Sequence, residues 1–118
     1  MKDATYPVNV KVWLICSNSR IQVFTDNGQF LKQIGRSGSG KGELNWPAMI
    51  AIDSEDKVYV IEFGNHRVSV FTSDGDYLTS FGTYGNGPQQ FKDPHGITVD
   101  KSGMVYVCDY SNNRVQVF

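Results

Sequence analysis

One sequence motif occurs three times in this chain, and its copies are 47 residues apart. They occupy residues 17–24, 64–71 and 111–118. Each copy contains, without gaps, an Asn, one intervening residue, an Arg, a β-branched apolar residue, a polar residue, a Val and a Phe. Repetition at a fixed period of this length indicates a repeat architecture, in which each unit buries its apolar face against its neighbours. The period therefore constrains the fold more than any single motif does.

The period divides the chain into two complete repeats and one partial repeat. Residues 11–57 form the first repeat, residues 58–104 the second, and residues 105–118 the beginning of the third. A length of 118 residues is that of one ordinary domain. We therefore interpret residues 1–118 as a single segment built from repeats.

Short segments rich in Val, Ile, Tyr and Phe predict antiparallel strands, and no helix is predicted. Asn27-Gly28 is a hairpin signal, because Asn-Gly accepts the positive φ angles of a type I′ turn. Residues 35–43 and 82–94 are glycine-rich loops. The predicted strands are residues 10–16, 20–24, 30–34, 50–53, 58–62, 67–71, 77–81, 97–100, 105–109 and 114–118.

Four strands, a to d in chain order, make up one unit. The chain holds strands b-c-d, then a-b-c-d, then a-b-c. A four-stranded unit of this length is typical of a propeller blade rather than of a helical or leucine-rich repeat. The predicted fold class is therefore all-β, a partial β-propeller of about two and a half four-stranded antiparallel blades. Strand 50–53 is nearly all apolar, and we expect it to be buried on both faces.

The overall charge and hydropathy argue against two kinds of partner. The net charge is -1, so no bulk electrostatic attraction to nucleic acid or to an anionic membrane is expected. No apolar run approaches the roughly 18 residues of a membrane-spanning helix. Cys16 and Cys108 occupy different positions in their repeats, both among apolar strand residues, so free thiols are expected rather than a disulfide. Free thiols favour a reducing compartment, and we predict a cytoplasmic location.

The second repeat resembles the NHL repeat family, and the resemblance extends over residues 11–118. The family pattern starts with an acidic residue at the end of a strand, a short turn and Asn-His-Arg before alternating apolar residues. It continues through Asp-Gly, an aromatic-Leu pair, Phe-Gly, a glycine-rich loop and a Pro-x-Gly-Ile segment. The first repeat departs from it, with Ile15 at the acidic position and Ala48-Met49 in place of His95-Gly96. The matching residues of the second repeat are Glu62, Asn65-His66-Arg67, Asp74-Gly75, Tyr77-Leu78, Phe81-Gly82, Gly85, Gly87, Gln90-Phe91, Pro94, Gly96-Ile97 and Val99-Asp100.

The resemblance implies a propeller, usually six-bladed, that binds partner molecules. Many family members form the C-terminal module of tripartite-motif proteins, in which a separate RING domain supplies ubiquitin-ligase activity. In those proteins the propeller binds partner proteins, and in some of them it binds RNA on one face. The resemblance therefore implies a substrate-recognition role in a RING-type ubiquitin ligase, with RNA binding as an alternative.

Residues present in every repeat are expected to serve the scaffold, because every blade needs them. Arg20, Arg67 and Arg114 follow a turn, where an Arg can pair with the acid that ends the preceding strand. That acid is Glu62 for Arg67 and Asp109 for Arg114. The repeated Asn is expected to take a positive φ angle in the turn and to bond the local backbone, and the repeated Phe is expected in the core. These residues are Asn18, Asn65, Asn112, Phe24, Phe71 and Phe118.

Unrepeated residues on the d-to-a loops and b-to-c turns are the candidates for partner binding. In a propeller both sets of loops lie on one face, and loops on a rigid scaffold are where recognition sites concentrate. Trp46 is either a binding anchor or a residue packed between blades. The charges of these loops are mixed and form no basic stripe, so RNA binding rests on the resemblance alone. The predicted partner-binding residues are Arg36, Lys41, Trp46, Met49, His66, Tyr84, Asn86 and His95.

His95 also has to be weighed as a metal ligand. It stands in a Pro-His segment at the start of an innermost strand, beside the central channel. Peptidylglycine α-hydroxyglycolate lyases are built on similar repeats and use such positions as zinc ligands, which makes a metal-dependent lyase or hydrolase a further alternative. A catalytic zinc usually needs three protein ligands, and the equivalent position one repeat earlier is Ala48. Asp53 and Asp100 end strand a and are expected to cap turns. We therefore predict no catalytic residue, no metal and no cofactor.

The main prediction is a non-catalytic binding or scaffold module that recognises a protein or peptide through its loop face. No association with a membrane is predicted. Propellers typically have four to eight blades, and the apolar faces at the two ends of a repeat array are normally covered. We therefore expect either further blades or the self-association of copies to complete the ring.

Overall fold

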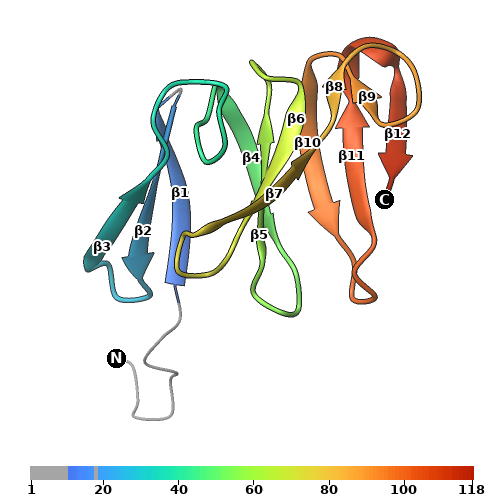
Figure 1. Ribbon diagram of the computed structural model, residues 1–118. Coiled ribbons are helices and arrows are strands. Elements are labelled where there is room, and N and C mark those ends of the chain that lie inside the picture. Colours follow the sequence, from blue (N-terminus) through green and yellow to red (C-terminus); the bar gives the residue numbers. More distant parts are fainter. Residues whose placement is uncertain (1–10, 18) are drawn as a thin grey trace.

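The computed structural model describes residues 11–17 and 19–118, and it consists almost entirely of β-strands (Figure 1). The one helix in this part of the chain is a short 3-10 helix, η1 (Tyr110–Asn112). The strands are β1 (Lys11–Ser17), β2 (Arg20–Thr25), β3 (Phe30–Ile34), β4 (Pro47–Ile52), β5 (Val58–Glu62), β6 (Arg67–Phe71), β7 (Tyr77–Phe81), β8 (Thr83–Tyr84), β9 (Gln90–Phe91), β10 (Pro94–Val99), β11 (Val105–Asp109) and β12 (Arg114–Val117).

Three antiparallel sheets lie side by side, and each corresponds to one blade (Figure 1). Blade 1 contains β1-β2-β3, blade 2 contains β4-β5-β6-β7, and blade 3 contains β10-β11-β12. The predicted order of strands b-c-d, a-b-c-d and a-b-c is confirmed, and with it the all-β propeller fold class. A parallel pair, β8 and β9, closes the loop between blades 2 and 3. A parallel bridge between Ser37 and Leu44 is its equivalent in the loop between blades 1 and 2.

The inner strands of blades 2 and 3 begin earlier than predicted, and that of blade 2 is more exposed than predicted. β4 and β10 begin at Pro47 and Pro94, ahead of the predicted strands. Each Pro pairs, beside a bulge, with the last residue of the neighbouring strand, and the first residue of a strand is a position where Pro is tolerated. The prediction that residues 50–53 are buried on both faces is wrong. β4 is the edge strand of its sheet, and Ile52 is 45% exposed.

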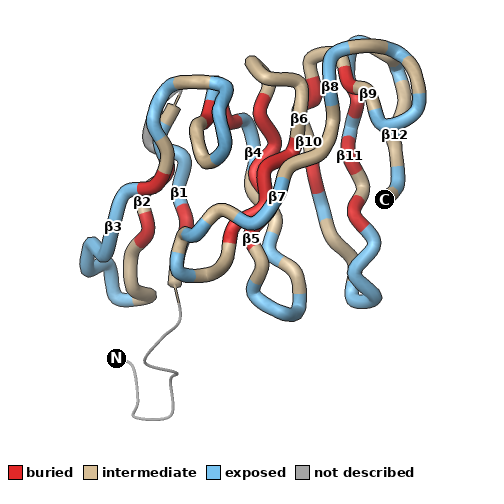
Figure 2. Tube along the Cα trace, in the orientation of Figure 1, coloured by how far each residue is buried: buried red, intermediate tan, exposed pale blue. Residues whose placement is uncertain are grey.

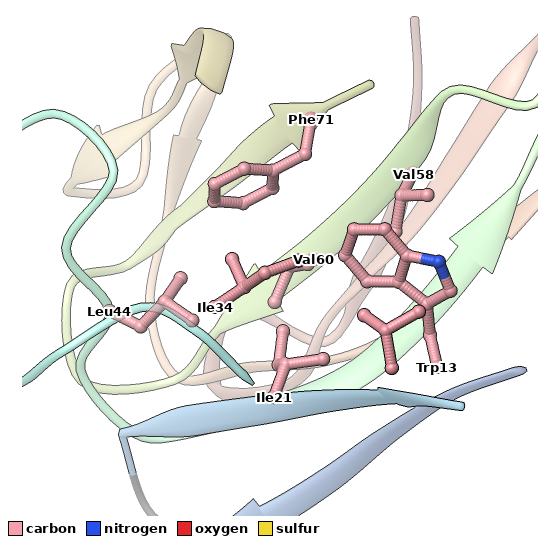
Figure 3. Close-up of a cluster of buried hydrophobic side chains, with 8 residues drawn as sticks. Trp13, Ile21, Ile34, Leu44, Val58, Val60 and Phe71 are labelled. Carbon is pink, nitrogen blue, oxygen red and sulfur yellow. The ribbon is translucent and has the colours of Figure 1, made fainter. Parts of the chain in front are cut away.

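Two apolar cores lie between the blades, and β5 contributes to both of them. Its side chains alternate, so Val58 and Val60 pack toward blade 1 while Tyr59 and Ile61 pack toward blade 3. Every residue of β5 is therefore buried (Figure 2). The core between blades 1 and 2 consists of Trp13, Ile21, Val23, Ile34, Leu44, Val58, Val60 and Phe71 (Figure 3). The core between blades 2 and 3 consists of Tyr59, Ile61, Val68, Val70, Phe91, Ile97, Val105 and Val107.

Of the three repeated phenylalanines, one is fully buried. Phe71 lies in the core between blades 1 and 2, as predicted. Phe24 and Phe118 are only half-buried, which corrects the prediction for them. Phe24 lies beside Val12 and Leu14 on the side of blade 1 that is turned away from blade 2. Phe118 packs at the margin of the core between blades 2 and 3.

The first blade departs from the 47-residue period in its strand register. Ile15 pairs with Ile21, and Ser17 pairs with Arg20, with a bulge between the two pairs. The extra residue of the bulge shifts β1 by one position relative to the other blades. Ser17 therefore faces the repeated Arg across the ladder, as Glu62 does in blade 2. The prediction that Ile15 takes the acidic position is wrong for this reason.

Candidate functional site on the loop face

The loops that carry the candidate residues lie along one side of the molecule. Residues 35–46 and 82–93 connect one blade to the next, and residues 63–66 and 110–113 connect the second and third strands of blades 2 and 3. All four segments lie along the upper edge of the view in Figure 1, as predicted for a propeller. We call this surface the loop face.

A buried carboxylate lies beneath the loop face in blade 2. Glu62, the last residue of β5, is fully buried. Its Oε1 accepts hydrogen bonds from the backbone N–H of Asn45 at 3.1 Å and from Nδ2 of Asn65 at 2.8 Å. Its Oε2 accepts hydrogen bonds from Nε of Arg67 at 2.8 Å and from the hydroxyl of Ser69. The carboxylate is therefore both paired with a cation and fully hydrogen-bonded, which the burial of a charge requires.

Arg67 also holds the loop that leads from blade 1 into blade 2. Its Nη1 donates to the carbonyl oxygen of Ser39 at 2.8 Å. Its Nη2 donates to the carbonyl oxygens of Gly40 at 3.0 Å and Glu43 at 2.8 Å. One guanidinium thus satisfies three backbone carbonyls in a glycine-rich segment and ties that segment to the buried carboxylate.

Blade 3 repeats this arrangement around a shorter acid. Asp109 accepts hydrogen bonds from the backbone N–H of Lys92 at 2.8 Å, from Nδ2 of Asn112 at 2.9 Å and from Nε of Arg114 at 2.8 Å. Burial on its own would raise the pKa of Asp109, but these bonds and one from Gln116 hold the pKa below its usual value. The terminal nitrogens of Arg114 donate hydrogen bonds to three carbonyl oxygens of the loop that enters blade 3. The predicted acid–Arg pairs are confirmed in both blades.

The repeated asparagines do not take the positive φ angle predicted for them. That conformation belongs to the next residue, which is His66 at 51° in blade 2 and Asn113 at 55° in blade 3. Asn65 and Asn112 instead direct their side-chain amides to the buried carboxylate and to a loop carbonyl. The Asn therefore serves each blade through its amide rather than through its backbone. Asn18 lies outside the described residues.

The repeated aspartates at the ends of β4 and β10 cap turns, as predicted. Asp53 Oδ1 accepts hydrogen bonds from the backbone N–H groups of Glu55 and Lys57, at 2.9 Å each. Asp100 makes the equivalent bonds in blade 3. These turns lie at the lower edge of the view in Figure 1, away from the loop face.

Four aromatic side chains form a row across blades 2 and 3 on the loop face. Trp46 ends the first inter-blade loop, and Phe63 directly follows β5. His95 is the second residue of β10, and Tyr110 directly follows β11. The ring centroids are 6.4 Å apart between Trp46 and Phe63, 5.1 Å between Phe63 and His95, and 4.8 Å between His95 and Tyr110. The rings are tilted or edge-to-face, which aromatic pairs prefer. We call these four residues the aromatic row.

The aromatic row borders a groove of about 410 Å³. Trp46 is 56% exposed at one end of the row, and Tyr110 is 62% exposed at the other. Trp46 is therefore too exposed to be a residue packed between blades. The groove is lined by Trp46, Pro47, Ala48, Phe63 and His95.

The scaffold holds the backbone of Trp46 in a conformation that few residues adopt. Its φ angle is 53°, in the left-handed region, and Asp93 takes the same φ one repeat later. The Trp46 carbonyl accepts a hydrogen bond from the Phe63 backbone N–H at 2.9 Å, and the Asn45 carbonyl accepts one from Gly64 at 3.1 Å. The turn after β5 thus fixes the backbone of Trp46 relative to that of Phe63.

A second cluster on the loop face surrounds His66. His66 and Tyr84 meet edge-to-face with their centroids 4.7 Å apart, and Lys92 Nζ lies 5.6 Å from the Tyr84 ring, within cation–π range. His66 Nδ1 accepts a hydrogen bond from the Asp93 backbone N–H at 3.1 Å. The Asp93 carboxylate accepts one from the hydroxyl of Ser111 at 2.7 Å. Two of the predicted binding residues, His66 and Tyr84, are therefore brought together here.

Four other predicted binding residues join neither cluster. Arg36 pairs with a carboxylate of its own loop at 2.9 Å, and Lys41 is exposed on that loop. Met49 accepts, through its sulfur, a hydrogen bond from a backbone N–H of β10 at 3.4 Å. The backbone carbonyl oxygen of Asn86 accepts a hydrogen bond from Arg114, and Asn86 is exposed.

Sequence reasoning does not select Phe63 and Tyr110, although both belong to the aromatic row. They stand at equivalent positions of the second and third repeats, each directly after the acid that ends a strand. The first repeat carries Cys16 at the same position of the period. An aromatic residue directly after the acid that ends a strand, in two of the three repeats, is the signal that could have identified the pair.

Among residues 11–17 and 19–118, no group of three or more His, Cys, Asp or Glu side chains is arranged to hold a metal ion. Within the same residues, no helix is long and apolar enough to cross a membrane. Cys108 is a free, exposed thiol.

Comparisons with known proteins place the chain among propellers. A family described as a 6-bladed beta-propeller matches residues 11–68, which cover blade 1 and much of blade 2. The NHL repeat matches residues 91–118, which cover blade 3. No curated protein sequence gives a significant match.

Among solved structures, the chain is similar to virginiamycin B lyase from Staphylococcus aureus, with a TM-score of 0.63 and 20% sequence identity. The match covers 93% of this chain and 38% of the lyase chain, so this chain spans well under half of the lyase's length. A likeness at this level of identity shows the fold alone. The blade topology and the two family matches together show a partial β-propeller that carries an NHL repeat in blade 3.

Proposed function

We propose that this chain is a non-catalytic binding module that recognises a protein or peptide partner through the aromatic row. Propeller repeat domains generally bind protein partners, and an NHL propeller serves in general as a binding or scaffold module. The observation that carries the proposal is the exposure of Trp46 and Tyr110 at the two ends of one row on a rigid scaffold. Trp and Tyr are enriched among the residues that dominate binding energy, because they bury a large apolar area and keep a polar tip available.

The surroundings of His95 favour binding over catalysis. Its ring lies between Phe63 and Tyr110, with centroids at 5.1 and 4.8 Å. Within residues 11–17 and 19–118, no carboxylate forms an ion pair or hydrogen bond with it. A general acid or base usually has a third group that orients it. Two rings on either side make His95 a contact surface instead.

The experiment that tests this proposal is selection of peptides from a random library on the immobilised chain. Selected peptides are expected to bind with an affinity that Trp46→Ala or Tyr110→Ala lowers by at least about tenfold. Met104→Ala is the matched control, because Met104 is 42% exposed at the turn between β10 and β11, away from the loop face. Binding that the loop-face variants leave unchanged, or no selected peptide at all, would contradict the proposal.

RNA binding is a second candidate, and the cluster around His66 favours it. A ring that stacks on bases and a cation beside it are what single-stranded nucleic acid requires, and Tyr84 and Lys92 supply one of each. The test is a salt titration of the binding of a single-stranded oligonucleotide. Electrostatic binding to phosphates weakens steeply as salt rises. No salt-dependent binding at low micromolar protein would eliminate this candidate.

A metal-dependent lyase or hydrolase is a third candidate, supported only by the Pro-His segment that begins β10. The test is metal analysis of the purified protein beside a His95→Ala variant. Stoichiometric zinc in the wild type that the variant loses would support this candidate. Equal and substoichiometric metal in both proteins would remove it.

In a larger protein, we propose that the module is the substrate-recognition part of a RING-type ubiquitin ligase and acts in the cytoplasm. The resemblance to tripartite-motif proteins supports this role. The ligase role requires that the gene for this chain also encodes a RING domain, which sequencing the full gene would show. A fluorescent fusion found outside the cytoplasm would contradict the proposed location.

A further inference from the structure

The groove beside the aromatic row presents apolar surface without charge. Its lining combines two aromatic rings, one imidazole, a proline and an alanine. Glu62 and Asp109 directly precede Phe63 and Tyr110 in the chain, but both carboxylates are fully buried and each is paired with an Arg. Charge complementarity therefore selects a neutral, apolar ligand. A phosphorylated or strongly acidic segment finds no cation in this groove.

The rings of the row keep unused hydrogen-bonding groups at the surface. The indole N–H of Trp46, the hydroxyl of Tyr110 and the ring nitrogens of His95 form no hydrogen bonds with the described residues. All three side chains are exposed. A ligand that packs on the rings and also offers carbonyl oxygens would satisfy these donors, whereas a purely hydrocarbon ligand would bury them unpaired.

One class of peptide combines these properties. A proline-rich segment in the polyproline II conformation has apolar pyrrolidine rings, and its carbonyl groups have no partner within the helix. Such segments dock in aromatic-lined grooves, and they lose little conformational entropy because their conformation exists before binding. The backbone hydrogen bonds that fix Trp46 against Phe63 give the groove the same advantage.

We propose that the aromatic row binds a proline-rich segment of a partner protein in the polyproline II conformation. The pyrrolidine rings pack into the groove between Trp46 and His95. The indole N–H and the Tyr110 hydroxyl donate to carbonyl oxygens of the segment. This inference rests on the proposed function, because it names the ligand class of the same site.

The test uses fluorescence polarisation with three labelled probes of about ten residues each. The first is polyproline, the second is a glycine-serine peptide of equal length, and the third is single-stranded RNA. Saturable binding of polyproline alone is expected. Trp46→Ala should weaken it by at least about tenfold, and Met104→Ala should leave it unchanged. Trp46→Phe keeps a ring but loses the N–H, so it should fall between the two.

The outcomes separate this inference from the proposed function. If library-selected peptides bind through the loop face but polyproline does not, the ligand class is wrong and the binding module stands. If no peptide binds, both fail. Polyproline binding that Trp46→Ala does not affect places the ligand elsewhere and overturns the inference, as does a preference for RNA. Circular dichroism of each variant verifies that the strands are intact, and exposed Trp46 is not needed for the core.

Discussion

Arg67 and Arg114 have the same role in neighbouring blades. Each pairs through Nε with a buried carboxylate and donates through its terminal nitrogens to three carbonyls of the preceding loop. Arg36 makes a similar-looking ion pair, but its side chain is 83% exposed and its partner belongs to the same loop. The difference in burial decides what each pair contributes, because exposed ion pairs contribute little and buried ones leave an uncompensated charge when broken.

Arg67→Ala is therefore expected to lower the free energy of unfolding by about 2–3 kcal/mol. The variant leaves Glu62 buried without its cation and leaves three loop carbonyls without their donor. Arg36→Ala is the control and should change the free energy by no more than about 0.5 kcal/mol. Urea denaturation of both variants measures this. Equal effects would show that the repeated arginines are not scaffold residues.

The environment of Asp109 predicts a loss of stability in acid. Its folded pKa lies below the ordinary value of 3.8, because hydrogen bonds to the charged form outweigh burial. A lowered folded pKa means that the stabilisation is complete above the ordinary value and is lost as the pH falls below it, through the folded pKa. The free energy of unfolding should therefore decline below about pH 4. In Asp109→Asn this decline should be shallower, and an unchanged decline would assign it to other carboxylates.

At the residue scale, the sequence predicts the acid–Arg pairs and not the aromatic row. The pairs follow from two residue types at a fixed spacing in one repeat. The row joins Trp46, an unrepeated residue of one loop, to Phe63 and Tyr110, which follow strands of two different blades. These rings come close together only because the loop between blades folds back on the turn that follows β5. The periodicity of the sequence does not determine how that loop folds.

The strands and turns are the elements that the repeat predicts best, since alternation and glycine positions are local signals. The errors lie where neighbouring strands decide the outcome. β4 and β10 start early because bulged pairing extends to Pro47 and Pro94. β1 shifts by one residue because a bulge follows Ile15. The residues that form this bulge give no sequence signal for it. The 47-residue period alone therefore misplaces the first strand.

The inter-blade loops depend on glycines at their first position. Gly82 follows β7 with a φ angle of 104°, and a Cβ placed on it would lie 2.5 Å from the ring of buried Phe91 and 3.2 Å from the Arg67 Cα. Gly103, in the turn before β11, has a φ angle of 89° but nothing within 4 Å of such a Cβ. The two positions share the backbone requirement and differ in the available space.

Gly103→Ala is therefore expected to cost about 1 kcal/mol from the backbone alone. Gly82→Ala should cost about 1–3 kcal/mol more, because the core at Phe91 must move to accept the methyl group. Thermal or urea unfolding of the two variants measures the difference. Equal losses of stability in the two variants would show that the Phe91 ring can move aside for the methyl group at little cost.

At the scale of the whole molecule, the blades at the two ends expose faces that blade 2 buries. In blade 2, one face packs on blade 1 through Val58 and Val60, and the other packs on blade 3 through Val68 and Val70. The equivalent side chains of blade 1 and blade 3 are exposed. They are Val12 and Leu14 in blade 1, at 39% and 49%, and Val115 and Val117 in blade 3, at 62% and 50%.

The two exposed faces match the two sides of an interface that already exists twice within the chain, so they should associate head to tail. Size-exclusion chromatography with light scattering should find oligomers whose mass rises with protein concentration. Val115→Asp should shift the distribution toward the monomer, whereas Leu78→Asp, on the outer strand β7, should not. A stable 13.2 kDa monomer at all concentrations would show that two and a half blades persist with their end faces open.

The arginine contacts also impose an order in time on the assembly of the loop face during synthesis. The loop of residues 35–46 is held by an arginine that is synthesised after it, in the middle of the following blade. The loop of residues 82–93 waits in the same way for Arg114. Chains emerge from the ribosome at about 5–20 residues per second, so each loop spends an interval of seconds without its clamp. Each blade therefore completes the part of the loop face that precedes it in the chain, and the loop face forms one blade behind the growing chain.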